Sequence, residues 1–596
     1  MKNNGMKVAA FLALGLLIMG SVGLPTEIMK FSELKKGMRG TGKTIFRDSR
    51  IEEFDFEILG FLKNFLPRKN LIIVKLNSEF LEGGGLLAGM SGSPLYVNGK
   101  IIGAAAYGLT GFPREPIAGV TPIEDILETA EYDNIKVNVD LSELQFQFNQ
   151  ENALKISRRV QRELLKRMDF APLGSKVTPI KLLSSSRGLH PQSYFTLQAL
   201  VTPLQGLPVS GNPQPREETT GLFTLAPGDA VSIPLITGDL EYSASGTVTH
   251  VNGEKVYMFG HPFFNLGTVD LPIHKAEVIS VLHSYSQSSR MVETTHPVGS
   301  VLQDRMSSIY GKLGQTPELI PLTVFLKNQD KKIQVQLTDH PLLTPSLSGI
   351  TLSSIFSSLF KDVGFQSIGV EGRIYIKDEQ DVILDDFYSG LDSINEFSSM
   401  VLVINFFLMN NNDQHVKIQK MDFELETSEI LRTAEITKVL INKHVFFEDE
   451  PVHIKIFYKK ANGRQVREEI SIRAPSIGPG KTFYLLIGGR EAISQFDSKN
   501  IKVSYFPAKL KYLIRAINNL RKNNRIYFKV FIPREGVYIN GHEYSGMPDT
   551  EQNLFQNHNI DFKKNIVRYS TITEYQLPVS HVIKGQQIIM LKTKER

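Results

Sequence analysis

The sequence predicts a mainly β protein made of several domains, and three observations support this prediction. The chain has 596 residues, too many for one hydrophobic core, and its 41% hydrophobic and 22% charged residues are typical of a globular protein. Apolar and polar residues alternate in many short segments, such as 54–58 and 452–458, and a period of two is typical of strands. Asn-Gly pairs, which suit tight hairpin turns, follow several such segments, at Asn98-Gly99, Asn252-Gly253 and Asn462-Gly463.

The amino terminus has the pattern of an export signal. Lys2 and Lys7 precede the apolar run from Val8 to Met19, and small residues lead up to Gly23. We expect residues 1–23 to be a secretory signal peptide, with an uncleaved anchor as the alternative. The expected location is therefore extracytoplasmic, either periplasmic or secreted, with membrane contact at most peripheral or through that anchor. The chain has no cysteine, which excludes disulfides, thiolate metal sites and cysteine nucleophiles.

The segment from Gly37 to Thr44 matches the Walker A pattern of phosphate-binding loops. Such a loop must leave a buried strand and enter a helix whose amino end faces the phosphates. Here the preceding segment is polar, and Phe54, Phe56 and Ile58 further on alternate with acidic residues as in a strand. We therefore expect no nucleotide binding and interpret the match as structural.

A β-rich unit is predicted over residues 28–135, and a Gly-rich turn lies at its centre. The turn reads Gly89-Met90-Ser91-Gly92-Ser93-Pro94 and is followed by the hairpin about Asn98-Gly99. Glycines on both sides of Ser91 allow a tight turn whose amides converge on one point, the surroundings that an acyl-transfer nucleophile needs. After it, Thr121 is expected to cap a short helix with Pro122 at its first position.

This turn resembles the Gly-Asp-Ser-Gly-Gly-Pro turn of trypsin-like serine peptidases, with Met90 and Ser93 at the differing positions. It is more similar to the Gly-Met-Ser-Gly-Ser-Pro segment of the SpoIVB peptidase family, named for stage IV sporulation protein B. The resemblance implies a trypsin-like two-barrel unit in which Ser91 is the nucleophile. It also implies an oxyanion hole formed by the amides of Gly89 and Ser91.

A helical, Pro/Gly-rich linker is expected over 136–220, with a basic helix from Glu151 to Met168, and a second β unit over 221–345. In that unit His261 ends an apolar strand, at a Gly-flanked turn that can present a side chain into a cleft. The SpoIVB family has its catalytic base in a similar strand ending in Gly-His, so the resemblance implies that His261 is the general base. The segment beginning Gln303-Asp-Arg also resembles that family.

Two features depart from the family's pattern. The Ser block precedes the His block here, whereas the order is reversed in the sporulation peptidase, so the two barrel halves are expected in permuted order; triads tolerate different chain orders. The family's acid also has no counterpart, because its place holds Leu76 or Asn77. Asn77, Asn265 and Asp270 remain candidates for the group that orients the imidazole.

The rest of the chain is expected to hold a mixed α/β segment over 346–425 and an immunoglobulin-like β-sandwich over 426–500. A helix plus a β segment is expected over 501–596, forming a small α/β carboxy-terminal part. Apolar residues at helical spacing, from Leu510 to Leu520, place the helix in this last part.

Two functions remain open from the sequence. One is an exported serine endopeptidase that cleaves a protein or peptide substrate through a Ser91 acyl-enzyme. The other is an inactive extracytoplasmic scaffold that keeps the peptidase fold and binds partners. No cofactor or metal is expected, since the histidines are scattered, and no basic patch interleaved with aromatic residues predicts nucleic-acid binding.

Overall fold

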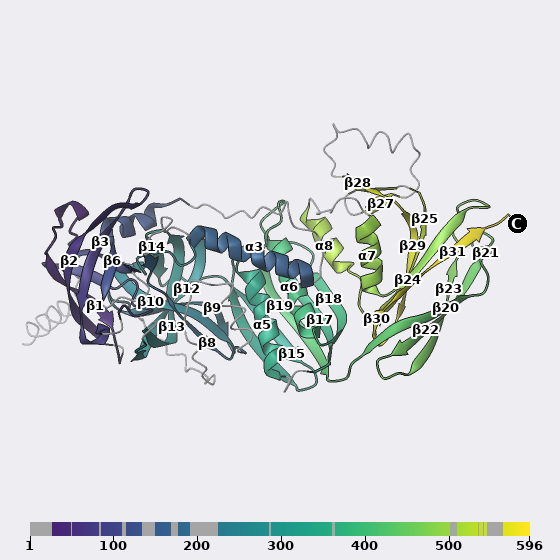
Figure 1. Cartoon of the computed structure of the whole chain (residues 1–596), viewed down its shortest axis with the longest axis horizontal. Coiled ribbons are helices and arrows are strands. Elements are labelled where there is room, and N and C mark those ends of the chain that lie inside the picture. The colour runs from purple at the N-terminus through teal and green to yellow at the C-terminus, as the bar shows by residue number, and fades with distance from the viewer. Residues whose placement is uncertain are drawn as a thin grey trace, which may run out of the picture.

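The computed structural model describes most of the chain beyond the amino terminus. The described residues are 27–48, 50–82, 85–109, 115–133, 150–168, 177–190, 224–284, 288–359, 364–500, 509–534, 536–539, 542–544 and 564–595. They are mainly β, and their parts follow one another along the long axis of the molecule (Figure 1). The expected signal peptide, 1–23, lies outside the described residues. Within the described ranges, no helix has both the length and the apolar character that a membrane crossing requires.

The first part is a closed β-barrel, drawn in purple and dark blue in Figure 1. Its sheet has the order β4-β1-β2-β3-β6-β5 and closes because β4 also pairs with β5. Closure pairs every strand on both sides and leaves no open edge. The six strands are β1 (Arg39–Ile45), β2 (Ile51–Leu66), β3 (Lys69–Asn77), β4 (Pro94–Val97), β5 (Lys100–Gly108) and β6 (Ile117–Pro122).

Local sequence patterns account for the strands of this barrel. Phe54, Phe56 and Ile58 on β2 are buried in its core, as their alternation predicts. Asn98 and Gly99 form the turn between β4 and β5 with φ of 50° and 78°, values that suit an Asn-Gly hairpin turn. The Walker-like segment becomes strand β1, paired with β2, and no helix follows it.

The second part is another closed barrel, with the order β9-β12-β13-β14-β11-β10 and closure through β9 and β10. Its strands are β9 (Ala230–Gly238), β10 (Glu241–Asn252), β11 (Lys255–Met258), β12 (Gly267–Leu282), β13 (Ser289–Arg305) and β14 (Ser308–Leu313). Two short strands precede it in the chain: β7 (Thr178–Pro179) pairs with β5 of the first barrel, and β8 (Leu183–Arg187) pairs with β10 of the second. The segment expected to be a linker therefore contributes strands to both barrels.

The sheet of the second barrel continues past residue 345 without a break. Strand β9 pairs with β16 (Lys331–Thr338), and the order then runs β15 (Leu319–Leu326), β19 (Ile418–Ser428), β17 (Gln366–Ile376) and β18 (Val382–Gly390). Helices α5 (Thr344–Leu359) and α6 (Ser393–Met409) pack on this extension (Figure 1). One hydrophobic core joins barrel and extension, so the strands on both sides of the expected boundary at 345 form one folded unit.

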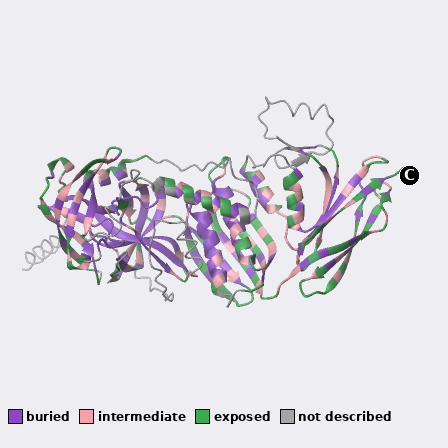
Figure 2. Ribbon diagram, viewed as in Figure 1, coloured by how far each residue is buried: buried purple, intermediate pink, exposed green. Residues whose placement is uncertain are grey.

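Helix α3 (Gln150–Met168) packs against α6, and it forms where the basic helix was predicted. Ala153, Ile156, Val160 and Leu164 lie on one face and belong to the core of the second barrel and its extension. Figure 2 shows buried residues concentrated in the barrels and under these helices. The apolar face of α3 therefore contributes to the fold.

The carboxy-terminal part is a sandwich of two sheets around a shared core. One sheet holds β20 (Thr433–Ile441), β22 (Pro451–Lys460), β23 (Gln465–Arg473) and β30 (Val582–Lys584). The other holds β21 (Val445–Phe446), β24 (Thr482–Gly488), β25 (Arg525–Ile532), β29 (Ser570–Pro578) and β31 (Gln586–Thr593). Strands beyond residue 500 thus complete the sandwich. A small sheet of β26 (Gly536–Ile539), β27 (His542–Tyr544) and β28 (Lys564–Val567) lies beside it.

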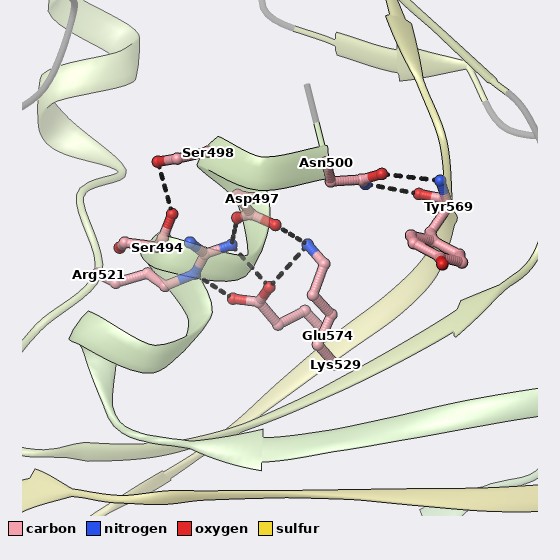
Figure 3. A network of polar contacts seen from close by, with 8 residues as sticks. All are labelled: Ser494, Asp497, Ser498, Asn500, Arg521, Lys529, Tyr569 and Glu574. Atoms are coloured by element: carbon pink, nitrogen blue, oxygen red, sulfur yellow. Dashed lines mark hydrogen bonds and ion pairs between the residues drawn. The ribbon is translucent and has the colours of Figure 1, made fainter. Parts of the chain in front are cut away.

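Two helices lie beside this sandwich, and one of them reaches the preceding unit. Helix α8 (Leu510–Asn518) inserts its apolar face, with Leu513 and Ile517, into the core of the preceding unit. Helix α7 (Arg490–Asn500) is held by the charged network in Figure 3, in which Arg521 contacts Asp497 at 2.8 Å and Glu574 at 2.7 Å. Lys529 lies 2.9 Å from Asp497, so two cations and two carboxylates balance one another and fix α7 against β25 and β29.

Candidate functional site

The Ser91 turn lies between the two barrels, just before β4. Gly89 and Gly92 flank it with φ of 90° and 96°, a region where side chains are strained. The side chain of Ser91 is fully buried, and its Oγ has no hydrogen-bond partner among the described residues. The glycines thus make the turn that the sequence predicts.

Strand β10 of the second barrel holds the carbonyl groups of this turn. The amide of Thr247 donates to the Ser91 oxygen at 2.8 Å, and the Thr247 hydroxyl donates to the Gly89 oxygen at 3.1 Å. The Thr249 hydroxyl donates to the Gly92 oxygen at 2.8 Å. Strand β10, which lies far from Ser91 in the sequence, therefore positions the turn that carries the candidate nucleophile.

The amides of the turn have internal partners as well. The Gly89 amide donates to the Lys181 oxygen at 2.9 Å, and the Gly92 amide donates to the Ala105 oxygen at 2.8 Å. The expectation that the Gly89 amide is free to form an oxyanion hole is therefore wrong in this conformation. Lys181 occupies it because the chain passes the turn between β7 and β8. The Ser91 amide makes no hydrogen bond to a described residue.

His261 follows β11 at a turn in which Phe259 and Gly260 have φ of 71° and 67°. Gly260 fits against Ala104 and Ala106 of the first barrel, since a methyl group on it would lie 3.0 Å and 3.2 Å from their Cβ atoms. The Thr121 hydroxyl donates to the Gly260 oxygen at 2.6 Å. The prediction that Thr121 caps a helix is therefore wrong: Pro122 occupies the cap position of α2 (Ile123–Leu127), and Thr121 holds the His261 turn.

These contacts bring the Ser91 and His261 segments to the same interface. A Cβ atom on Gly92 would lie only 2.5 Å from the backbone nitrogen of Phe259, two residues before His261. The imidazole is 2% exposed and its Nε2 has no hydrogen-bond partner among the described residues. Ser91 Oγ and His261 Nε2 are thus both buried and unpaired, and no hydrogen bond joins them.

The backbone orients the imidazole. Its Nδ1 lies 2.7 Å from the Pro262 carbonyl oxygen, which only accepts hydrogen bonds, so a neutral imidazole carries its proton on Nδ1 and leaves a lone pair on Nε2. Burial lowers the pKa of His261 to about 4, although the nearby Pro262 and Ile180 carbonyls partly oppose this shift. The group is therefore neutral at pH 7.

None of the three predicted orienting residues contacts the imidazole. Asn77 is exposed at the end of β3, and Asn265 lies in the turn before β12 with φ of 55°. Asp270, on β12, accepts hydrogen bonds from the Ser300 hydroxyl and, at 2.8 Å, from the Glu318 amide. The expectation of a side-chain partner at these positions is wrong in this conformation, because the Pro262 carbonyl takes that place.

Asp304, near the end of β13, accepts hydrogen bonds from the backbone that follows His261. Its carboxylate is fully buried and accepts hydrogen bonds from the amides of Phe263 and Phe264, both at 2.8 Å, and of Leu266 at 3.1 Å. Burial raises the pKa of Asp304 to about 6, while these three amides and Arg305 lower it. No role for Asp304 was predicted from the sequence, although its place in a segment resembling the family was an available signal.

The buried imidazole should make the protein sensitive to acid. The folded state keeps His261 neutral down to about pH 4, whereas the unfolded chain protonates it near 6.5. The unfolded state therefore binds more protons between these values, and the contribution of His261 to stability is lost as the pH falls from 6.5 to 4. We expect a loss of about 3 kcal/mol from this group, measured as the difference between wild type and His261→Gln in urea unfolding at pH 7 and pH 4.

Asp304 acts in the opposite direction, since its raised pKa favours the folded state as the pH falls below about 6. It is present in both proteins of this comparison, so its effect largely cancels. If wild type and His261→Gln lose the same stability between pH 7 and pH 4, the imidazole is not held neutral by burial.

No cluster of three or more His, Asp or Glu side chains arranged to hold a metal ion occurs in the described parts of the chain. The interface between the barrels instead holds the Ser91 hydroxyl, the His261 imidazole and the Ser91 amide, none of which has a hydrogen-bond partner at Oγ, Nε2 or N among the described residues. This set fits acyl transfer through a serine nucleophile.

Comparison with known proteins agrees with this chemistry. Residues 22–116 match the family model of SpoIVB peptidase S55, a range that includes the Ser91 turn and most of the first barrel. A serine turn set in a closed barrel, together with this match, suggests a serine peptidase. The family predicted from the turn is thereby confirmed: this segment belongs to the SpoIVB peptidase family. His261 lies outside the matched range, and no curated protein and no solved structure matches the chain.

Proposed function

We propose that this protein is an exported serine endopeptidase of the SpoIVB type, with Ser91 as nucleophile and His261 as general base. The two barrels then form a trypsin-like unit with permuted halves, in which the Ser91 barrel precedes the His261 barrel. The carboxy-terminal sandwich, which we expect to be immunoglobulin-like, follows and is joined to the preceding unit through α8. The protein acts on a protein or peptide substrate outside the cytoplasm.

One observation carries the proposal most strongly. Two segments from different barrels deliver a serine hydroxyl and an imidazole nitrogen to one interface, and both atoms are buried without a partner. Each unpaired buried polar atom costs stability, and these two are complementary, because the hydroxyl can donate and the imidazole nitrogen can accept. Two such atoms with complementary chemistry at one interface favour a catalytic pair.

The reaction follows from the protonation state. With its proton on Nδ1, the imidazole accepts the Ser91 proton at Nε2 while Oγ attacks the peptide carbonyl. The imidazolium returns that proton to the leaving amine, which departs and leaves an ester on Ser91. Water activated at Nε2 then hydrolyses the ester and restores the hydroxyl. The Ser91 amide is the remaining donor for the oxyanion.

Catalysis requires an opening step. Ser91 is 0% exposed and His261 is 2% exposed, so a peptide reaches them only after the chain around the turn moves. Freeing the Gly89 amide from the Lys181 oxygen would complete a two-donor oxyanion hole. Exposure of the imidazole would also bring its pKa closer to neutrality, where a general base works best.

A second candidate is the inactive extracytoplasmic scaffold. It is favoured by the occupied Gly89 amide and by the absence of a carboxylate at the imidazole among the described residues. The intact glycine-flanked turn opposes it, because a purely structural turn does not need an unpaired serine hydroxyl.

Labelling with a fluorophosphonate probe tests the function on the full chain. We expect a covalent adduct on Ser91, mapped by mass spectrometry, and no adduct at this position in Ser91→Ala. His261→Gln should label about 10²- to 10⁴-fold more slowly, because it loses the base. Ser580→Ala, an exposed serine in the sandwich, serves as the control and should label like wild type. Absence of any adduct in the folded wild-type protein would favour the scaffold.

A further inference from the structure

Arg290, at the start of β13, is a buried cation without a counter-ion. It is 0% exposed and among the largest fully buried side chains. No carboxylate forms an ion pair with it among the described residues, and its Nε has no hydrogen-bond partner there. Burial lowers the pKa of Arg290 to about 9, so the group remains charged at neutral pH. A buried, unpaired charge is costly, so its location needs a physical reason.

The guanidinium joins the two barrels. One terminal nitrogen donates to the Ile45 oxygen at 3.1 Å and to the Thr44 hydroxyl at 3.4 Å, both at the end of β1. The other donates to the Thr247 hydroxyl at 3.1 Å and to the Gly246 oxygen at 3.3 Å, both on β10. All four acceptors are neutral, so the charge itself is not required to satisfy them.

The same residue also borders the Ser91 turn. The Arg290 amide donates to the Ala88 oxygen at 3.3 Å, and a methyl group on Gly89 would lie 3.3 Å from the guanidinium. Thr247, which Arg290 holds through its hydroxyl, donates to the carbonyl oxygens of both Gly89 and Ser91. Arg290 thus acts on the turn directly at Gly89 and indirectly through Thr247.

We propose that Arg290 is a positioning residue for the Ser91 nucleophile, holding β10 and the Ser91 turn together and placing a positive charge beside the turn. Its catalytic consequence rests on the proposed peptidase function. A cation in a water-excluded site favours the negative charge that develops when the Ser91 oxygen attacks a carbonyl. The four hydrogen bonds of Arg290 go to neutral acceptors and need only a polar side chain, so they do not account for its charge. Stabilising the negative charge that develops on the attacked carbonyl does.

Hydrogen exchange tests the positioning part without any need for activity. In the full chain, we expect the protected amides of residues 86–95 to exchange about tenfold faster in Arg290→Met than in wild type, because the bonds through Thr247 loosen. Arg290→Lys should restore part of the protection. Arg305→Met is the matched control on the same strand, because Arg305 bonds Gln303 and Asp133 and does not contact the turn. Unchanged exchange in Arg290→Met, or an equal change in Arg305→Met, overturns the proposal.

Fluorophosphonate labelling tests the role of the charge. We expect Arg290→Met to label Ser91 about tenfold or more slowly at saturating probe, with the half-saturating probe concentration unchanged, and Arg290→Lys to recover part of the rate. Equal rates in wild type and Arg290→Met overturn the electrostatic role. If wild type forms no adduct, the peptidase function fails, while hydrogen exchange still decides whether Arg290 positions the turn. Should Arg290→Met not fold, Arg290→Lys against wild type decides both measurements.

Discussion

Gly92→Ala is expected to lower the free energy of unfolding by about 4–6 kcal/mol, because strain in the turn and overpacking against β10 add together. Gly92 has φ of +96°, and an added Cβ atom would lie 2.1 Å from the Thr247 oxygen and 2.5 Å from the Phe259 nitrogen. Both contacts are to backbone, which no change of rotamer relieves. The substitution therefore forces the Ser91 turn away from the second barrel.

Gly37→Ala is the matched control for this prediction. Gly37 has a similar φ of +85°, but an added Cβ atom would meet nothing within 4 Å. We expect it to cost only about 1 kcal/mol from backbone strain. Both variants are compared with wild type in urea, following the transition that involves the barrels by far-UV circular dichroism. Similar losses in the two variants would mean that the barrels do not pack closely at Gly92.

Asp304→Ala is expected to destabilise the protein by about 3–5 kcal/mol, because three buried amides lose a charged acceptor together. These amides belong to the turn that follows His261, so the turn should loosen and admit water. The pKa of His261 should then rise toward its ordinary value of 6.5, from the value of about 4 that burial imposes. An NMR titration of the imidazole protons measures this shift, and urea unfolding measures the loss of stability.

Asp270→Ala provides the comparison for Asp304→Ala. Asp270 lies in the same barrel and also accepts hydrogen bonds, but it is only partly buried and makes no contact with the His261 turn. We expect a loss of about 1 kcal/mol and no change in the pKa of His261. If both variants shift the imidazole equally, Asp304 has no special part in holding the turn.

Local patterns predicted many elements of this fold correctly. Alternation placed β2 and β22, helical spacing placed α8, and Asn98-Gly99 formed the expected hairpin. Each of these signals acts over a few residues, through backbone conformation and the side-chain period of a strand or helix. These local signals did not predict which elements pack against one another. Helix α8 was expected within the last segment, yet its apolar face lies in the core shared by the second barrel and α6.

The candidate site likewise combines features that were visible in the sequence with contacts that were not. The glycine-flanked serine and the Gly-His strand end were visible in the sequence, and the family match to residues 22–116 confirms the family to which the serine turn was assigned. Some polar contacts of the site differ from those predicted. Thr121 looked like a helix cap, but its hydroxyl holds Gly260, and the imidazole uses the Pro262 carbonyl where a side chain was expected.

The sequence alone was sufficient for the class of fold, the strand-forming segments and the residue types capable of acyl transfer, because these depend on short-range periodicity, turn chemistry and motif spacing. Only the tertiary structure decided that the Gly89 amide donates to the Lys181 oxygen, that Arg290 lies beside the turn without a counter-ion, and that Asp304 accepts from the backbone after His261. These are contacts between residues distant in the chain. They depend on how two closed barrels pack against each other, and no local pattern records that packing.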